Sequence, residues 1–312
     1  MRVFSADEIH AALPWPVLVE QLARAFAAGA HAPVRHAHAL GGPDALLLMP
    51  AWSDAVVGIK LVTVMPGNVQ RGLATVQATY LLLDRASGRP LAMLDGEALT
   101  LRRTAAASAL AARDLARPGA RCLLIVGTGQ LAAWMARAHH ATQPTLERVL
   151  VWGRNTQAAH ALAGTLARES IAATPCDDLQ AAVRCADIVS CATTSTEPLV
   201  RGAWLQPGTH LDLVGGFKPD MREVDDDAVA MSRICVDTYA GALSEAGDLV
   251  QPLREGRIAR GHILAELAEL ARNETRVRQS PDDITLFKSV GTALEDLAAA
   301  QLVWERAQAA PR

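Results

Sequence analysis

The sequence predicts an α/β protein with two parts, a strand-rich α+β domain followed by a doubly wound parallel sheet. Three observations support this. The chain has 312 residues, more than a single hydrophobic core usually holds. Short apolar runs with turn signals fill residues 34–95, whereas after residue 120 apolar runs alternate with helical patterns. Strands that alternate with helices form parallel sheets with right-handed crossovers.

The first domain is expected to begin with helix. Ser5 and Glu8 have the spacing of a capping box, and the helical periodicity that follows is interrupted by Pro14 and Pro16 and ends at Gly29. Strands are expected in "ALLLMPAW", "VVGIKLVTVMP", "ATVQATYLLLD" and "PLAMLDG", with "DRASGRP" as a hairpin turn between the last two. The alanine-rich segment 99–116 predicts a helix, which Pro118–Gly119 stops.

The second domain is expected to start at the composition change near residues 117–119. Buried strands are predicted in "RCLLIV", "LERVLVW", "CADIVSCATT", "GTHLDLVGG" and "RICVDT", with helices between them. The segment "LFKSVGTALEDLAAAQLVWERA" predicts one long final helix. The predicted domains are therefore residues 1–117, completed by the final helix at about 290–312, and residues 118–289.

Composition excludes several kinds of partner. Half of the residues are hydrophobic, the net charge is −3 and no long basic run occurs, so neither nucleic acid nor an anionic membrane is expected. The five cysteines are scattered without a CxxC pair, which indicates reduced thiols in a cytoplasmic protein. The nine histidines lack metal-ligand spacing, so no metal is expected, and no apolar run reaches the ~18 residues of a membrane span.

The segment "VGTGQLA" predicts a dinucleotide site of the Rossmann type. It follows an apolar strand and opens a helix, the context that gives a GxGxxA pattern its meaning. Gly127 allows the tight turn, Gly129 lets a pyrophosphate approach the backbone, and Ala132 permits close packing of the helix on the strand. The free N–H groups of the helix N-terminus would then bind the phosphates.

The end of the second strand favours NADP(H), with NAD(H) possible. NAD-selective folds usually carry an acid there to accept from the ribose 2′-hydroxyl, but this chain has Gly153, Arg154 and Asn155. A guanidinium binds a 2′-phosphate through paired hydrogen bonds, where a carboxylate would repel it. The alternative is that Arg154 is an ordinary surface side chain.

The first domain offers Arg35, Lys60, Arg102 and Arg103, with few acids nearby in the sequence. Lys60 lies within an apolar strand, where an unpaired ammonium would be costly to bury. It therefore either reaches solvent or meets an anion, and a substrate carboxylate would supply that anion.

The chain resembles the ornithine cyclodeaminase/μ-crystallin family nearly from end to end. The resemblance is carried by "GIKLVTVMPGN", "GLATVQATYLLLD", "SGRPLAMLDGEALTLRRTAAASALAA", "VGTGQLA", "CATTS", "VGGFKPDMREVD" and "LFKSVGTALEDL". It implies a homodimer in which the N-terminal part and the last helix form the substrate and dimerisation domain around a Rossmann domain. It also implies that Arg35, Lys60 and Arg103 hold the carboxylate of an imino or amino acid, with Lys60 and Arg103 as the catalytic pair, and that Thr75 lines the site. The dinucleotide would be lined by Thr104, Gln130, Leu131, Thr193, Val214 and Ser289.

Two departures from the ornithine cyclodeaminase pattern change the expected chemistry. Leu47 stands where that enzyme has an acid near the ornithine side chain, and Phe217 stands where it has the Asp of "VGGD" that serves deamination. Without these acids the distal ammonium of ornithine would be desolvated without a partner, and the base needed to add water and expel ammonia would be missing. Phe217 would instead line an apolar pocket for a ring. The alternatives are that Phe217 packs under the nicotinamide edge, or that Asp220, Glu223 or Asp225 replaces the lost acid.

The sequence therefore predicts an NAD(P)H-dependent reductase of small cyclic ketimine carboxylates such as Δ1-pyrroline-2-carboxylate or Δ1-piperideine-2-carboxylate. Three rivals stay open: an ornithine cyclodeaminase, an amino-acid dehydrogenase of the alanine type, and a crystallin-like protein that binds NADPH without catalysis.

Overall fold

The computed structural model of the protein describes residues 1–309, and its chain divides into two units. Unit 1 comprises Met1–Thr104 and Thr292–Arg312, and unit 2 comprises Ala105–Gly291. The division falls inside helix α3 (Gly96–Leu115), which begins in unit 1 and ends in unit 2. The last three residues of the predicted final helix, 310–312, lie outside the described residues.

Unit 1 is built on a six-stranded sheet. The strands lie in the order β1 (Arg2–Phe4), β6 (Pro90–Asp95), β5 (Val76–Asp84), β4 (Val56–Val64), β3 (Asp44–Trp52) and β2 (His36–Gly41). Only the β1–β6 pair is parallel, and β5 and β6 form the predicted hairpin. The 3-10 helix η1 (Pro66–Arg71) lies between β4 and β5.

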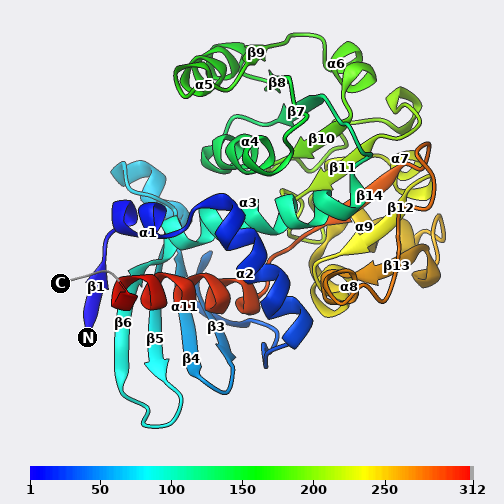
Figure 1. Ribbon diagram of the computed structural model, residues 1–312. Coiled ribbons are helices and arrows are strands. Elements are labelled where there is room, and N and C mark those ends of the chain that lie inside the picture. The colour runs from blue at the N-terminus through cyan, green and yellow to red at the C-terminus, as the bar shows by residue number, and fades with distance from the viewer. Residues whose placement is uncertain (310–312) are drawn as a thin grey trace. The chain divides into compact units, whose positions relative to one another are not determined.

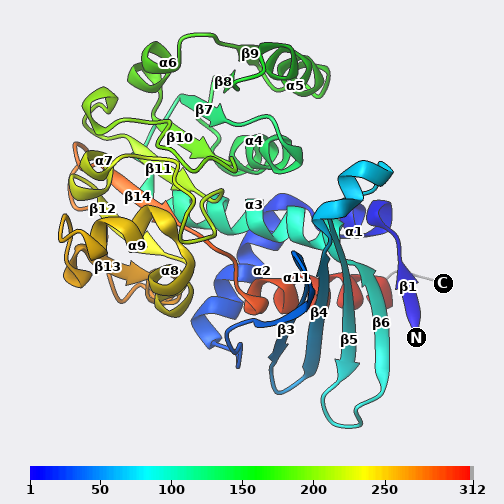
Figure 2. The same cartoon turned by 180° about the vertical axis from the view of Figure 1, so that it is seen from behind.

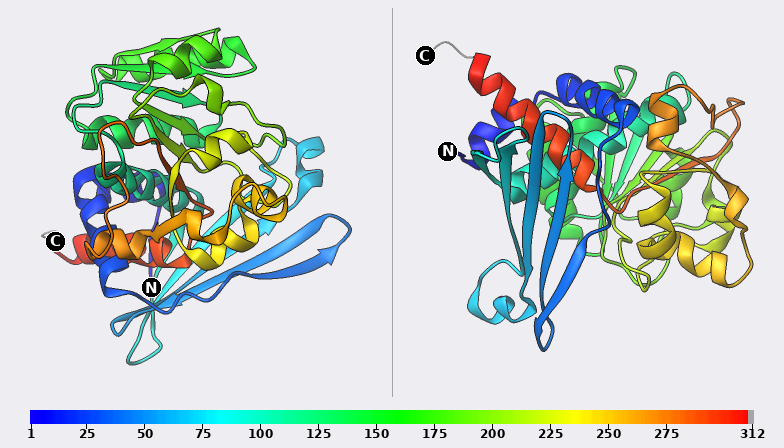
Figure 3. Two further views of the ribbon diagram at one scale, coloured as in Figure 1. Left: turned by 90° about the vertical axis from the view of Figure 1, so that its right-hand side faces the viewer. Right: turned by 90° about the horizontal axis from the view of Figure 1, so that it is seen from below.

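Two helix boundaries in unit 1 coincide with the capping signals in the sequence, the start of α1 and the end of α2. Ser5 and Glu8 form the capping box of α1 (Ala6–Ala12), and α2 (Trp15–Ala28) ends at Gly29, whose φ of 76° suits glycine. Helix α11 (Ala293–Ala309) lies across strands β3 to β6, as Figure 1 shows. Seen from behind, the same strands lie in front of α11 (Figure 2), so α11 covers one face of the sheet. The view from below (Figure 3) shows the same two layers.

The face of the sheet towards α11 is buried because side chains alternate along each strand. Met49, Lys60, Tyr80 and Leu94 lie side by side across four strands in this face, and all four are buried. Three of them are apolar or aromatic, as expected of a core. The charged member of the row, Lys60, is therefore the residue whose burial needs an explanation.

Unit 2 is the predicted doubly wound sheet, with all neighbouring strands parallel. Its order is β13 (Ile263–Glu266), β12 (Arg233–Val236), β14 (Thr285–Lys288), β11 (His210–Leu213), β10 (Ile188–Cys191), β7 (Cys122–Val126), β8 (Arg148–Trp152) and β9 (Ala173–Pro175). The helices are α4 (Gln130–Thr142), α5 (Thr156–Arg168), α6 (Leu179–Cys185), α7 (Asp226–Ala230), α8 (Tyr239–Glu245), α9 (Gly247–Arg254) and α10 (Leu267–Ala271), with 3-10 turns η2 (Gly202–Trp204) and η3 (Arg260–His262). The predicted fold class is confirmed. The winding direction reverses between β7 and β10, and in such sheets this is where ligands bind.

One predicted element is wrong. The segment after Thr285 is not the start of the final helix, because Thr285–Lys288 forms the buried strand β14 and the helix begins only at Ala293. Gly291, with a φ of 82°, lies in the turn between them. A four-residue strand that is buried on both faces has no alternation to distinguish it from a helical turn. No helix in residues 1–309 has the length and apolar character needed to cross a membrane.

Candidate functional site

The glycine turn after β7 has the geometry of a phosphate cradle. Gly127 has a φ of +122°, and a Cβ there would lie 2.6 Å from the carbonyl oxygen of Ala192, so only glycine fits. Gly129 is different, because a Cβ on it would meet no atom within 4 Å. Gly129 precedes α4 without a side-chain cap, and Gln130 at the helix start is exposed. The open space beside Gly129 and the uncapped N–H groups of α4 fit a dinucleotide pyrophosphate.

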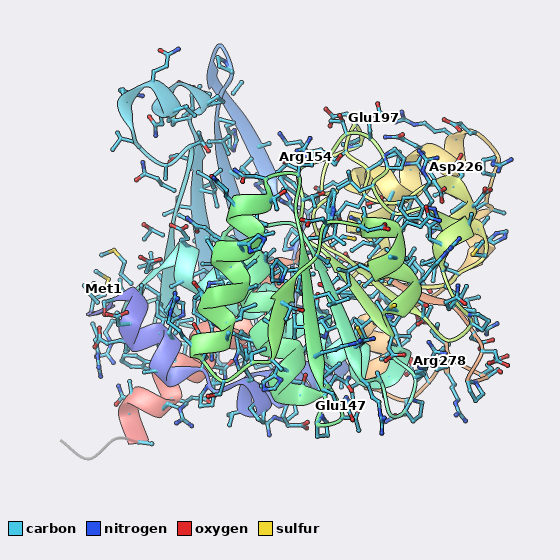
Figure 4. All side chains as sticks on the ribbon, turned by 90° about the horizontal axis from the view of Figure 1, so that it is seen from above. Met1, Glu147, Arg154, Glu197, Asp226 and Arg278 are labelled. Carbon is cyan, nitrogen blue, oxygen red and sulfur yellow. The ribbon has the colours of Figure 1, made fainter. Side chains whose placement is uncertain are left out.

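The carboxyl end of β8 carries the residues that were expected to select the cofactor. Arg154 is exposed there, as Figure 4 shows, with Glu147 labelled near the opposite end of the strand. Asn155 caps α5 by accepting a hydrogen bond from the N–H of Ala158 at 3.1 Å. A Cβ on Gly153 would lie 2.5 Å from Cγ2 of Thr128 in the glycine turn. A side chain at position 153 would therefore require the side chain of Thr128 to shift, and Arg154 is the charged residue that follows the strand.

A buried carboxylate that the sequence did not single out for this role, Glu223, organises the loops after β10 and β11. Its Oε1 accepts hydrogen bonds from the N–H (2.8 Å) and the hydroxyl (2.9 Å) of Thr193. Its Oε2 accepts from the N–H groups of Gly215 (2.8 Å) and Gly216 (3.3 Å). Glu223 thus ties together the loops that contain two of the predicted cofactor residues, Thr193 and Val214.

Two further carboxylates fix the neighbouring loops. Asp248 accepts from the N–H of Glu223 at 2.7 Å and from Nζ of Lys288 at 2.9 Å. Asp237 accepts from the hydroxyl of Ser289 at 3.0 Å and from two backbone N–H groups after β14. Burial raises the pKa of Glu223, and Lys288 opposes that shift. Burial lowers the pKa of Lys288, but Asp248 and Glu223 outweigh it and the net shift is upward.

Phe217 lies on the loop surface of unit 2 and is 39% exposed. The ammonium of Lys218 lies 5.9 Å from its ring centroid. Of the three acids that follow in the sequence, Glu223 is engaged as described, Asp225 caps α7 and accepts from the N–H of Gly202 at 2.8 Å, and Asp220 is exposed. The two buried or capping acids are therefore committed to backbone N–H groups.

Unit 1 brings Lys60 of β4 and Arg103 of α3 together on the carboxylates of α11. The ammonium of Lys60 lies 2.7 Å from Oδ2 of Asp296, in an ion pair. Arg103 donates through Nε to Oδ1 of Asp296 at 3.0 Å and through Nη1 to Oε2 of Glu295 at 2.6 Å. All four side chains are buried. Of the two alternatives for Lys60, solvent or an anion, the structure shows an anion, and it is supplied by Asp296, an acid far along the chain.

These contacts set the charge state of the cluster. The pKa of Lys60 is lowered to about 8, chiefly by burial and also by Arg103 and Arg35, against the opposing effect of Asp296. Burial raises the pKa of Asp296, but Arg103 and Lys60 outweigh it and hold the carboxylate ionised. At neutral pH Lys60 and Arg103 are therefore cations and Asp296 is an anion, and Arg35 adds a positive charge beside them.

The remaining predicted residues of unit 1 occupy different settings. Arg35 is half-buried and close enough to influence Lys60, Thr75 is half-buried in the loop after η1, and Thr104 is buried on α3. Leu47 lies opposite Val62 and on the same face of the sheet as Lys60. The guanidinium of Arg102 packs 3.8 Å from the ring centroid of Trp15, so this arginine is part of helix packing. Within residues 1–309 no group of three or more histidine, cysteine or acidic side chains could hold a metal.

A family model described as the ornithine cyclodeaminase/mu-crystallin family matches residues 8–310. The chain belongs to this family. Among its relatives is a Δ1-pyrroline-2-carboxylate reductase of Paracoccus denitrificans, 43% identical over 85% of this chain and 84% of the relative. The structure of the reductase of that name from Thermococcus litoralis, solved with NADH and L-proline, matches with a TM-score of 0.93 and 34% sequence identity. The match covers 99% of this chain and 98% of the Thermococcus chain. An archaeal alanine dehydrogenase dimer with bound NAD matches with a TM-score of 0.92 and 26% sequence identity. The match covers 99% of this chain and 96% of the dehydrogenase chain.

Proposed function

We propose that this member of the ornithine cyclodeaminase/μ-crystallin family is an NAD(P)H-dependent imine reductase. Its substrates are small cyclic ketimine carboxylates of the Δ1-pyrroline-2-carboxylate type, and its products are L-imino acids such as L-proline. The observation that carries this proposal is that two of the acids which follow Phe217 in the sequence are engaged in hydrogen bonds within the protein. Of the three acids that could replace the lost one, Glu223 has four donors and Asp225 caps a helix, so neither is available as the base that ammonia release requires, and Asp220 is exposed. The pyrroline-2-carboxylate reductases among its relatives support the same reaction.

The reaction needs little protein chemistry beyond binding. The reduced nicotinamide, when bound, supplies a hydride to the imine carbon, and the ring nitrogen takes up one proton. Gly127, Gly129 and the start of α4 hold the dinucleotide phosphates, and the Glu223 network fixes the loops that carry Thr193 and Val214. Lys60, Arg103 and Arg35 bind the substrate carboxylate, and Phe217 supplies an apolar wall for the ring. These roles follow the residue types and the contacts within each unit.

We further propose that NADPH is the preferred cofactor. The support is the exposed guanidinium of Arg154 at the carboxyl end of β8 and the absence of an acid at positions 153–155, which read Gly-Arg-Asn. A charge-assisted contact of this kind contributes about 1.5–3 kcal/mol, which favours NADPH over NADH roughly tenfold to a hundredfold. The nicotinamide cofactor itself is supported by the NAD(H) bound in the two solved neighbours.

A homodimer is proposed on the basis of the sheet face in unit 1 that points away from α11. Its central rows pair Leu48 with Leu61, and Ile59 with Pro50 and Leu81. These side chains are half-buried or exposed in the single chain, and Leu61 is 39% exposed. An apolar sheet face of this kind usually marks an interface. A cytoplasmic location is also proposed, because all five cysteines are unpaired.

One set of assays tests the function. Purified protein is given NADPH or NADH with pyrroline-2-carboxylate, and separately NAD with L-ornithine or L-alanine, while nicotinamide absorbance and ammonia are followed. Oxidation of NADPH only with the imine supports the proposal. Ammonia and proline from ornithine would identify a cyclodeaminase, NADH from alanine would identify a dehydrogenase, and saturable NADPH binding without turnover would identify a binding protein.

A further inference from the structure

One carboxylate in unit 1 is shared by the two cations assigned to the substrate. Asp296 meets Lys60 through Oδ2 and Arg103 through Oδ1, at 2.7 Å and 3.0 Å. The three residues come from three elements, α11, β4 and α3, and the side chains of Lys60, Arg103 and Asp296 are 4%, 6% and 0% exposed. A carboxylate so placed fixes the distance between an ammonium and a guanidinium that would otherwise repel each other.

We propose that Asp296 is a positioning residue that holds Lys60 and Arg103 as one preassembled site for the substrate carboxylate. The inference rests on the proposed function, since it assigns a partner to the cations of the same site. Asp296 uses both of its oxygens on these cations, and Arg103 uses Nε and Nη1 on α11. Nη2 of Arg103 has no protein partner among the described residues, which leaves one edge of the guanidinium for a ligand.

The neighbouring acid, Glu295, provides a matched comparison. Glu295 is equally buried and adjacent in sequence, and its Oε2 accepts from Nη1 of Arg103. No contact between Glu295 and Lys60 is found among residues 1–309. Asp296 therefore acts on both cations, whereas Glu295 acts on Arg103.

Charge alone and positioning predict opposite effects of removing Asp296. At a pH low enough for Lys60 to stay protonated in both proteins, neutralising an anion beside a carboxylate site removes repulsion, so a purely electrostatic role predicts tighter substrate binding and a lower KM. A positioning role predicts weaker binding, because Lys60 and Arg103 would separate. The groups that face Lys60 are Asp296 from α11, Arg103 from α3, Arg35 before β2 and Tyr80 from β5. Without Asp296, the influences that remain on the pKa of Lys60 are burial, Arg103 and Arg35, and all of them lower it.

The test compares Asp296→Asn with Glu295→Gln in the full-length protein. For Asp296→Asn we expect KM for pyrroline-2-carboxylate to rise about tenfold or more, and the alkaline limb of kcat/KM to move below about pH 8. Glu295→Gln should leave that limb at the wild-type pH, and both variants should bind NADPH as the wild type does. A lower KM in Asp296→Asn, or an alkaline limb that does not move, would overturn the inference.

Two further measurements cover the remaining outcomes. If Asp296→Asn does not fold, the double variant Lys60→Met/Asp296→Asn is compared with the single variant Lys60→Met. Because Lys60 is absent from both, the inference requires a higher KM in the double variant, caused by the loss of the contact between Asp296 and Arg103. An unchanged KM would contradict it. If the wild type does not reduce the imine, the proposed function fails, and calorimetric binding of pyrrole-2-carboxylate, an unreactive ring carboxylate, decides the inference. Weaker binding in Asp296→Asn supports it, whereas equal binding, or none in the wild type, refutes it.

Discussion

The buried ammonium of Lys60 predicts a specific dependence of stability on pH. In the folded chain its pKa falls from the ordinary 10.5 to about 8, chiefly because of burial. At roughly 1.4 kcal/mol per pKa unit, this corresponds to about 3 kcal/mol of destabilisation that is fully present below pH 8. Between pH 8 and 10.5 the unfolded chain binds more protons at this lysine than the folded chain does. Stability therefore rises with pH across that window.

The perturbation that isolates this contribution is Lys60→Met, which keeps an unbranched side chain and removes the titrating group. The free energy of unfolding of both proteins would be measured by urea denaturation at several values from pH 7 to 10. The wild type should gain about 2–3 kcal/mol relative to Lys60→Met over this range. The titrating groups that do not contact Lys60 are present in both proteins and cancel in the difference. A difference that stays flat, or that falls as the pH rises, would refute the assignment of Lys60 as a buried cation with a lowered pKa.

Three other predictions concern unit 2. Gly129→Ala should keep the wild-type melting temperature and lose about tenfold or more in NADPH affinity. Gly127→Ala should lose affinity and also lower the melting temperature, because its Cβ meets the carbonyl of Ala192. Equal melting temperatures for the two variants would contradict the geometry. Arg154→Ser should raise KM for NADPH about tenfold to a hundredfold and leave KM for NADH nearly unchanged, and equal losses with both cofactors would exclude the 2′-phosphate contact. Glu223→Gln replaces one acceptor oxygen by a donor, at a cost of about 1–3 kcal/mol. The affinity for the dinucleotide, measured by fluorescence, should therefore fall about tenfold or more. Unchanged affinity would show that the loops do not depend on Glu223.

The parts of the fold that local sequence signals describe were predictable. The capping box at Ser5, the glycine stop at Gly29 and the strand–glycine–helix pattern before α4 all depend on residues close together in the chain. The buried strand β14 was not predictable, because its four residues, Thr-Leu-Phe-Lys, show no alternation of apolar and polar side chains and fit a helix equally well.

The cation site was only half predictable, for a reason of sequence distance. The burial of Lys60 in an apolar strand indicated that it needs an anion, but the choice of anion depended on where the last helix packs. The signal that could have found it is the adjacent pair Glu295–Asp296 within a run of alanine and leucine, since acids in an apolar helix face need buried partners as well. A cation in one apolar segment of the sequence and an acid in another each require a buried partner of opposite charge. Matching the two segments predicts a contact that neither segment indicates alone.

The same reasoning separates the two kinds of buried acid in this chain. Glu223, Asp237 and Asp248 accept mainly from backbone N–H groups, so they fix loop geometry, and a neutral acceptor of the same shape would retain part of that role. Asp296 accepts from side-chain cations, so its charge cannot be replaced without leaving a buried ammonium uncompensated. Replacing Asp296 by a neutral residue is therefore expected to disturb Lys60 and Arg103 together, whereas a neutral acceptor at Glu223 is expected to disturb only part of its loop.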